Sequence, residues 1–187
     1  MDTQRKGGPR ANALKREMVI RAEASSRAPA EVVYDVLAEV RTHLIWAGEW
    51  QKKNTRLISV EAPEGPASVG TEFTTSGADP MGRFTDSSVV TEASRPTSFE
   101  FVTEAHLETK KGKTADWTNV HRYELTRTLE GCRIVYTVTV TRISALPGML
   151  TLFNSRILSG SVKKAAGSVG RRGVRNLARL SEERAGG

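Results

Sequence analysis

The sequence is short of the residues that build disulfides and metal centres. It has one cysteine, Cys132, and three histidines among 187 residues. A single thiol excludes an intrachain disulfide and a multi-cysteine metal site, and no two histidines have the spacing of metal ligands. We therefore expect no metal and no other cofactor. We expect Cys132 to be a small residue of the core or of a sheet edge.

Long hydrophobic runs are also missing. No stretch approaches the roughly 18–20 apolar residues that span a bilayer. The polar segment 1–17 has no apolar core of the kind found in secretory signals. No glycine-rich phosphate loop and no serine in the setting of a nucleophile is found. These absences predict a cytoplasmic protein and disfavour a serine hydrolase.

The positive charge of the chain is concentrated at its two ends. The net charge is +7, and the basic segments 1–17 and 160–187 account for all of it, so the body between them is close to neutral. Such ends could contact nucleic acid or an anionic membrane surface, or could be a solvated tail and a soluble helix face. The composition predicts a disordered basic tail over residues 1–17 and a single domain over residues 18–183.

The middle of the chain alternates between apolar and polar residues, which is the period of a β-strand with one buried face. The pattern predicts a first strand from Met18 and six more at about 57–61, 69–76, 83–93, 98–107, 117–129 and 133–141. The last two are rich in β-branched and aromatic residues and read as an antiparallel hairpin.

Helical spacing occurs on both sides of these strands. Residues 29–40 and 42–47 predict two short helices, and an apolar stripe from Leu150 to Leu180 predicts a long C-terminal helix. Glycines interrupt the stripe, and each costs about 1 kcal/mol relative to alanine. We expect the helix either to bend or approach the sheet closely there, or to fray near Gly170. The order of elements predicts an α+β fold in which the long helix covers the sheet.

Three segments resemble a known family. Residues 28–37 (APAEVVYDVL), followed nine residues later by Trp46, look like the opening helices of the START-like, or SRPBCC, superfamily. Residues 69–73 (VGTEF) resemble its third strand, and residues 90–101 (VTEASRPTSFEF) its strand-turn-strand around an Arg-Pro pair. The resemblance spans about residues 19–180 and is closest to the polyketide cyclase/dehydrase and lipid-transport group. It implies a helix-grip fold, in which a seven-stranded curved antiparallel sheet wraps around the long helix, with two short helices after strand 1.

The resemblance also implies a hydrophobic cavity between the sheet and the C-terminal helix. Combined with the alternation, it predicts a set of inward-facing ligand-binding residues, which are Trp46, Phe73, Phe99, Phe101, Trp117, Asn119, His121, Tyr123, Tyr136, Val138, Phe153 and Ile157. In the alternative interpretation, these aromatic side chains fill the interior solidly.

Asn119, His121 and Tyr123 are the polar members of one strand face. Alternate residues lie about 6.5–7 Å apart along a strand, so all three could contact one ligand. His121 and Tyr123 are candidate catalytic residues, because a histidine exchanges protons near neutral pH and a tyrosine can bond a carbonyl or an enolate. The alternative is that these groups only orient a ligand or satisfy one another. Asp86 could be a carboxylate partner if its side of the strand faces inward.

The other two histidines are expected outside the site. His43 lies in the second short helix and is predicted to be exposed. His106 shares a strand face with Glu100, Glu104 and Glu108 and is predicted to face solvent.

Three functions are compatible with these patterns. The leading hypothesis is a non-enzymatic carrier or sensor of a hydrophobic small molecule of the lipid, polyketide or aromatic type. The second is a polyketide cyclase/dehydrase-like enzyme, and the third is an interaction protein that uses its basic surface on RNA or membrane. We expect a monomer or a homodimer with no specific nucleic-acid partner and with weak membrane-surface contact at most, although the last helical turns carry Arg171, Arg172, Arg175 and Arg179.

Overall fold

The computed structural model describes residues 13–51, 56–78, 82–143 and 156–187. Within these residues the chain forms one antiparallel sheet in the order β1-β7-β6-β5-β4-β3-β2. Strands β2 to β7 pair in chain order, and β1 closes against β7. The strands are β1 (Ala13–Ser26), β2 (Arg56–Glu61), β3 (Glu72–Ala78), β4 (Gly82–Ser94), β5 (Ser98–Thr109), β6 (Thr114–Thr128) and β7 (Gly131–Ile143).

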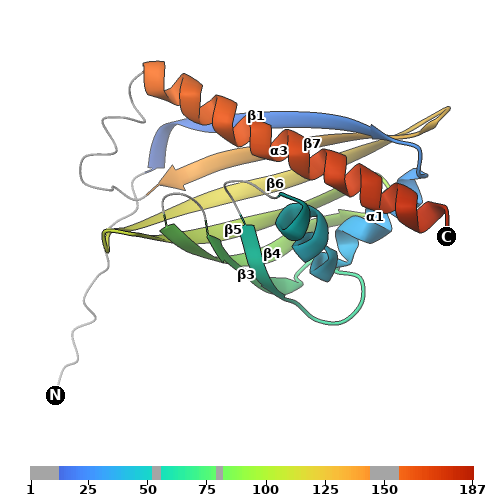
Figure 1. The fold of residues 1–187 in the computed structure, drawn as a ribbon, viewed down its shortest axis with the longest axis horizontal. Coiled ribbons are helices and arrows are strands. Elements are labelled where there is room, and N and C mark those ends of the chain that lie inside the picture. The colour runs from blue at the N-terminus through green and yellow to red at the C-terminus, as the bar shows by residue number, and fades with distance from the viewer. Residues whose placement is uncertain (1–12, 52–55, 79–81, 144–155) are drawn as a thin grey trace.

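Helices connect β1 to β2 and follow β7. Helix α1 (Ala30–Ala38) leads into the 3-10 turn η1 (Val40–Thr42), the π-helical turn η2 (Leu44–Gly48) and the 3-10 turn η3 (Glu49–Gln51). The long helix α3 (Arg156–Ala185) crosses the sheet alongside β1 and β7, and its C-terminal end lies near α1 (Figure 1). This arrangement confirms the predicted α+β helix-grip fold.

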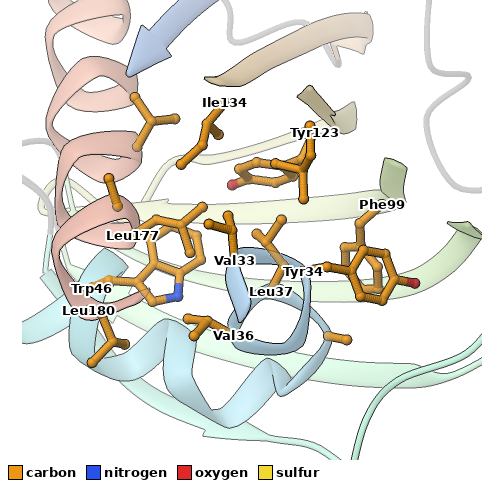
Figure 2. Packing of buried hydrophobic residues seen from close by; sticks show 14 of the residues in the cluster. Val33, Tyr34, Val36, Leu37, Trp46, Phe99, Tyr123, Ile134, Leu177 and Leu180 are labelled. Carbon is orange, nitrogen blue, oxygen red and sulfur yellow. The ribbon is translucent and has the colours of Figure 1, made fainter. Parts of the chain in front are cut away.

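Helix α1 fills one end of the space between the sheet and α3. Val33, Val36 and Leu37 are each 0% exposed, because residues three and four positions apart share one face of a helix. Figure 2 shows this face directed toward Trp46 and Leu177. On the other side of α1 the rings of Tyr34 and Phe99 meet edge to face, with 6.0 Å between their centroids. Side chains therefore pack this end densely.

The inner face of the sheet is organised in rows of residues that lie directly opposite one another in neighbouring strands. The His121 row contains Phe101, His121, Val138 and Ile20. The Asn119 row contains Phe73, Ser88, Thr103, Asn119 and Val140. The Asp86 row contains Thr75, Asp86, Ala105, Trp117 and Ile143. Because α1 covers only one end of the sheet, these rows face the remaining space below α3.

Several element boundaries differ from the sequence-based expectation. Strand β1 begins at Ala13 rather than near Met18, so the expected tail over 1–17 overlaps the sheet, and its residues 1–12 lie outside the described part of the chain. Strand β3 begins at Glu72 rather than near Val69, because Gly70 has a φ of 87° and the Thr71 N–H donates to the Ser68 carbonyl in a turn.

The helical segments also refine the expectation. The second short helix, expected over 42–47, is a run of 3-10 and π-helical turns over 40–51. Helix α3 does not fray at Gly170 but continues to Ala185. Cys132 is 1% exposed and unpaired, which confirms its prediction as a small core residue. Among the described residues, no helix has the length and hydropathy needed to cross a membrane.

Candidate functional site

A cavity of about 510 Å³ lies between the inner face of the sheet and α3. The structure places nine of the predicted site residues around it, namely Trp46, Phe73, Phe101, Trp117, Asn119, His121, Tyr123, Tyr136 and Val138. The interior is thus hollow, and the solidly filled alternative is wrong. Tyr123 is 4% exposed and stacks on Tyr136, with 4.7 Å between the ring centroids, so the sheet turns both tyrosines inward.

Three predicted site residues are not among the described lining. Phe99 points inward as expected, but Tyr34 of α1 covers it, so it belongs to the packed core and is 0% exposed. Phe153 lies outside the described residues. Ile157 lies in the first turn of α3, and its side chain is outside the description.

His121 is held in place by two neighbours from adjacent strands. Its ring stacks on Phe101 with 4.7 Å between centroids and an angle of 11° between planes. Its Nδ1 shares a hydrogen bond of 2.7 Å with the Tyr136 hydroxyl. Burial, together with the nearby His43, lowers the pKa of His121 to about 3. The imidazole is therefore neutral at pH 7 and serves as a fixed polar group.

The two tyrosines at this end of the cavity also stay protonated. Burial raises the pKa of Tyr123 well above its ordinary value, and burial raises the pKa of Tyr136 as well. Each phenol can therefore donate one hydrogen bond. Tyr123 can donate to a ligand oxygen, and Tyr136 can donate either to a ligand oxygen or to His121 Nδ1.

The prediction that His43 is exposed is wrong. Its side chain is 5% exposed, lines the cavity, and lies edge to face with Trp46 at 4.7 Å. Its Nε2–H donates to the Leu37 carbonyl over 3.2 Å, and burial lowers the pKa of His43 to about 4. The irregular turns between α1 and β2 rotate it inward, which a helical period could not indicate. His106 is exposed as predicted, beside Asp116.

Asp86 is the residue whose orientation the sequence left open. The register shift of β4 against β5 falls between Val90 and Glu92, after Asp86, so the alternation is intact at this position. Its carboxylate therefore points into the cavity, where Oδ2 accepts a long 3.4 Å hydrogen bond from Thr75 Oγ1. Burial raises the pKa of Asp86 to about 6.

The cavity floor is the part of the inner sheet face that lines the cavity. Two buried acceptor atoms on this floor have no hydrogen-bond partner within the described structure. They are Asp86 Oδ1 and Asn119 Oδ1. Other polar groups of the floor satisfy each other, as Ser88 Oγ and Thr103 Oγ1 do over 2.8 Å. Buried polar atoms are rarely left unpaired, so these two are exceptions that the hydrogen bonds of the described residues do not explain.

Glycines of α3 form part of the opposite wall. A Cβ atom on Gly170 would lie 3.4 Å from the Tyr136 ring and 3.5 Å from Ala22 Cβ, and one on Gly173 would lie 3.4 Å from Gln51 Nε2. Both glycines line the cavity. The sequence expectation that α3 approaches the sheet closely at its glycines is confirmed.

Comparisons with known proteins identify the fold. No family model and no curated protein matches the chain. Among solved structures, protein TTHA0849 from Thermus thermophilus has a TM-score of 0.60 at 16% identity, covering 88% of this chain and 97% of its own. Protein CV1439 from Chromobacterium violaceum has 0.59 at 13%, and Ara h 8.0201 has 0.52 at 12%, each with the same coverage. At such identities the likeness is one of fold. The chain is thus a helix-grip protein with an internal cavity.

Proposed function

We propose that the protein binds an apolar small molecule of the lipid, polyketide or aromatic type in this cavity and acts as its carrier or sensor. The observation that carries the proposal is the cavity of about 510 Å³ with mostly apolar and aromatic walls and a few polar groups. Small-molecule sites commonly have this size and composition. The resemblance to the lipid-transport group of the SRPBCC superfamily agrees with it.

The arrangement of the polar groups favours binding over catalysis. His121 is neutral and engaged with Tyr136, so its imidazole is a poor proton acceptor at pH 7. Asp86 has a pKa closer to neutrality, but it lies four residues along the sheet from the His121 row, a distance of about 13 Å. The carboxylate and the imidazole therefore do not form an acid–base pair.

The second candidate function is a polyketide cyclase/dehydrase reaction. The observation that supports it is the titratable carboxylate of Asp86 in the cavity lining. Turnover of a poly-β-ketone by the wild-type protein, lost in His121→Ala and Tyr123→Phe, would move the protein to this class. Turnover that both variants retain would remove these residues from the mechanism.

The test of the binding proposal is thermal stabilisation across a panel of lipids, polyketides and polycyclic aromatics. A ligand present at 100 times its Kd adds about 2.7 kcal/mol to the free energy of unfolding, which raises the Tm by several degrees. Native mass spectrometry of the freshly purified protein would identify a co-purified ligand.

A matched pair of variants locates the binding. Val138→Phe narrows the cavity and should weaken binding, whereas Val89→Phe adds the same ring at a position that is 36% exposed outside the cavity lining and should not. A panel without any Tm shift, or equal weakening by both variants, contradicts binding at this site.

A further inference from the structure

We propose that the ligand of this cavity carries a cationic amine that forms an ion pair with the carboxylate of Asp86. The inference rests on the proposed function and adds the chemical class of the ligand. It starts from the two unpaired acceptors on the cavity floor, Asp86 Oδ1 and Asn119 Oδ1.

The carboxylate of Asp86 lacks the partners that a buried charge requires. One oxygen accepts a single long hydrogen bond from Thr75, and the other has no partner within the described structure. A buried ionised group without compensation is costly, and proteins rarely keep one unless a ligand or a partner charge completes it. Asp86 lines the cavity, so a ligand in the cavity can approach its carboxylate and supply the missing partner.

No basic side chain of the protein occupies that role among the described residues. The part of the lining that the structure describes contains neither lysine nor arginine. Within the described lining, the titratable groups on the other elements are His43, His121, Tyr123 and Tyr136, and burial keeps all four uncharged at pH 7. Arg172 of α3 is not part of the described lining. It lies beside the lining residue Gln51, and its Nη1 donates to the Gln51 carbonyl over 2.7 Å.

Asp86 is therefore the one ionised side chain of the described cavity lining at neutral pH, even with a pKa of about 6. An anionic ligand, such as a fatty acid, would place a like charge in a cavity that already holds one and would be repelled. A cation would be attracted, and the low dielectric of the interior strengthens that attraction.

Aromatic rings near Asp86 favour a cation over a neutral donor. Trp117 lies in the Asp86 row, and Phe84 precedes Asp86 by two residues on the same strand face; both line the cavity. The faces of such rings attract ammonium groups. Asn119, in the neighbouring row two strands away, offers a second acceptor about 10 Å across the sheet for another donor of the ligand.

The test uses three fluorescent probes with the same ring system, which are 9-(aminomethyl)anthracene, 9-(hydroxymethyl)anthracene and anthracene-9-carboxylate. At pH 7.5 we expect the full-length protein to bind the amine at least tenfold more tightly than the alcohol, and the carboxylate most weakly, as measured by fluorescence titration. A hydrogen bond to a charged group is worth about tenfold or more in affinity.

Two further arms connect the preference to Asp86. Asp86→Asn should remove the preference for the amine while alcohol binding changes less than about threefold, and Glu108→Gln, which removes an exposed charge from β5, should leave all three affinities unchanged. In the wild-type protein, lowering the pH from 7.5 to 5.0 should weaken amine binding up to about tenfold as Asp86 takes up a proton, with no such loss for the alcohol. This arm needs no variant and holds even if Asp86→Asn folds poorly.

The outcomes separate the two proposals. If the alcohol or the carboxylate binds as tightly as the amine, or if Asp86→Asn retains the preference, the cation inference is overturned while the binding function stands. If none of the three probes binds and the wider panel gives no Tm shift, the proposed function falls and takes the inference with it.

Discussion

A carboxylate in an apolar cavity should lower the stability of the unliganded protein, and Asp86 allows this to be measured. Its pKa rises from the ordinary value near 3.8 to about 6 in the folded protein. Between these values the folded state binds more protons than the unfolded state, so this group's contribution to stability is present at pH 4 and is lost as the pH rises through 6.

Asp86→Asn should therefore raise the free energy of unfolding at pH 8 by about 1–2 kcal/mol and leave it nearly unchanged at pH 4. Urea unfolding at the two pH values measures the difference. His43 and His121, whose pKa values burial lowers, titrate with the opposite sign in both proteins and cancel in the comparison. A variant less stable at pH 8 than the wild type would indicate that the carboxylate has a favourable partner.

Prediction from sequence was good for residues inside regular strands and poor at their margins. Trp117, Asn119, His121 and Tyr123 alternate along β6, and the alternation combined with the family resemblance predicts the correct side for each. Asp86 could not be assigned, because a single bulge in β4 reverses every side chain beyond it, and the position of a bulge is not encoded in the alternation. Its inward position required the observed register.

At the scale of elements, Gly170 sets how closely α3 approaches the sheet and how much room the cavity has beside it. A methyl group at Gly170 would make ordinary contacts, 3.4 Å from Tyr136 and 3.5 Å from Ala22. Gly170→Ala should therefore stabilise the protein by about 0.5–1 kcal/mol through helix propensity. Gly170→Leu should instead project into the cavity and reduce ligand affinity at least tenfold.

Thermal unfolding and probe titration of the two variants check this prediction. Arg175→Leu is the control for the larger substitution, because it places the same side chain at an exposed position of α3 outside the cavity lining and should leave ligand affinity unchanged. Destabilisation by Gly170→Ala would mean that the sheet and the helix are closer here than a methyl group allows. Unchanged affinity in Gly170→Leu would place the ligand elsewhere.

The irregular turns η1 to η3 limited prediction at the element scale. The strands and the two regular helices follow from periods of 2 and 3.6, and the resemblance over about residues 19–180 supports their order. The turns over 40–51 combine 3-10 and π-helical geometry, so no single period describes which side chains face inward. His43 and Gln51 both reach the cavity from this segment, and neither was predicted there.

At the scale of the whole molecule, the cavity separates two hydrophobic clusters of unequal size. The larger one joins α1, α3 and the half of the sheet that α1 covers. The smaller one consists of Leu107 and Ala115 with Phe84 and Trp117, at the far ends of β4, β5 and β6. Regions with less buried apolar surface open at lower free energy, so the far end should be the less stable one.

Hydrogen exchange should resolve this difference. In the unliganded protein the backbone amides of residues 105–107 and 115–117 should exchange faster than those of 99–101 and 121–125. A ligand that touches both walls should slow exchange at the far end most, because Phe84, Leu107, Ala115 and Trp117 line the cavity. Equal exchange at both ends without ligand contradicts the argument.

The basic C-terminal surface also has an intramolecular role. Arg179 lies over the Trp50 ring at 4.6 Å and pairs with Glu183, and Arg172 bonds the Gln51 carbonyl. Two of the four clustered arginines thus hold α3 against the turns over 40–51. This favours the interpretation of the cluster as a structural and solubilising helix face over that of an RNA- or membrane-docking surface.

The glycine-lined wall has a consequence for how this protein can diversify. In the proposed complex, the glycines of α3 leave room for the ligand, and Asp86 of β4 and Asn119 of β6 present polar groups to it. A larger side chain at Gly170 or Gly173 would therefore favour a shorter ligand, while the carboxylate of Asp86 would still select the charge of that ligand. A scaffold partitioned in this way suits stepwise tuning, by natural selection or in a designed biosensor.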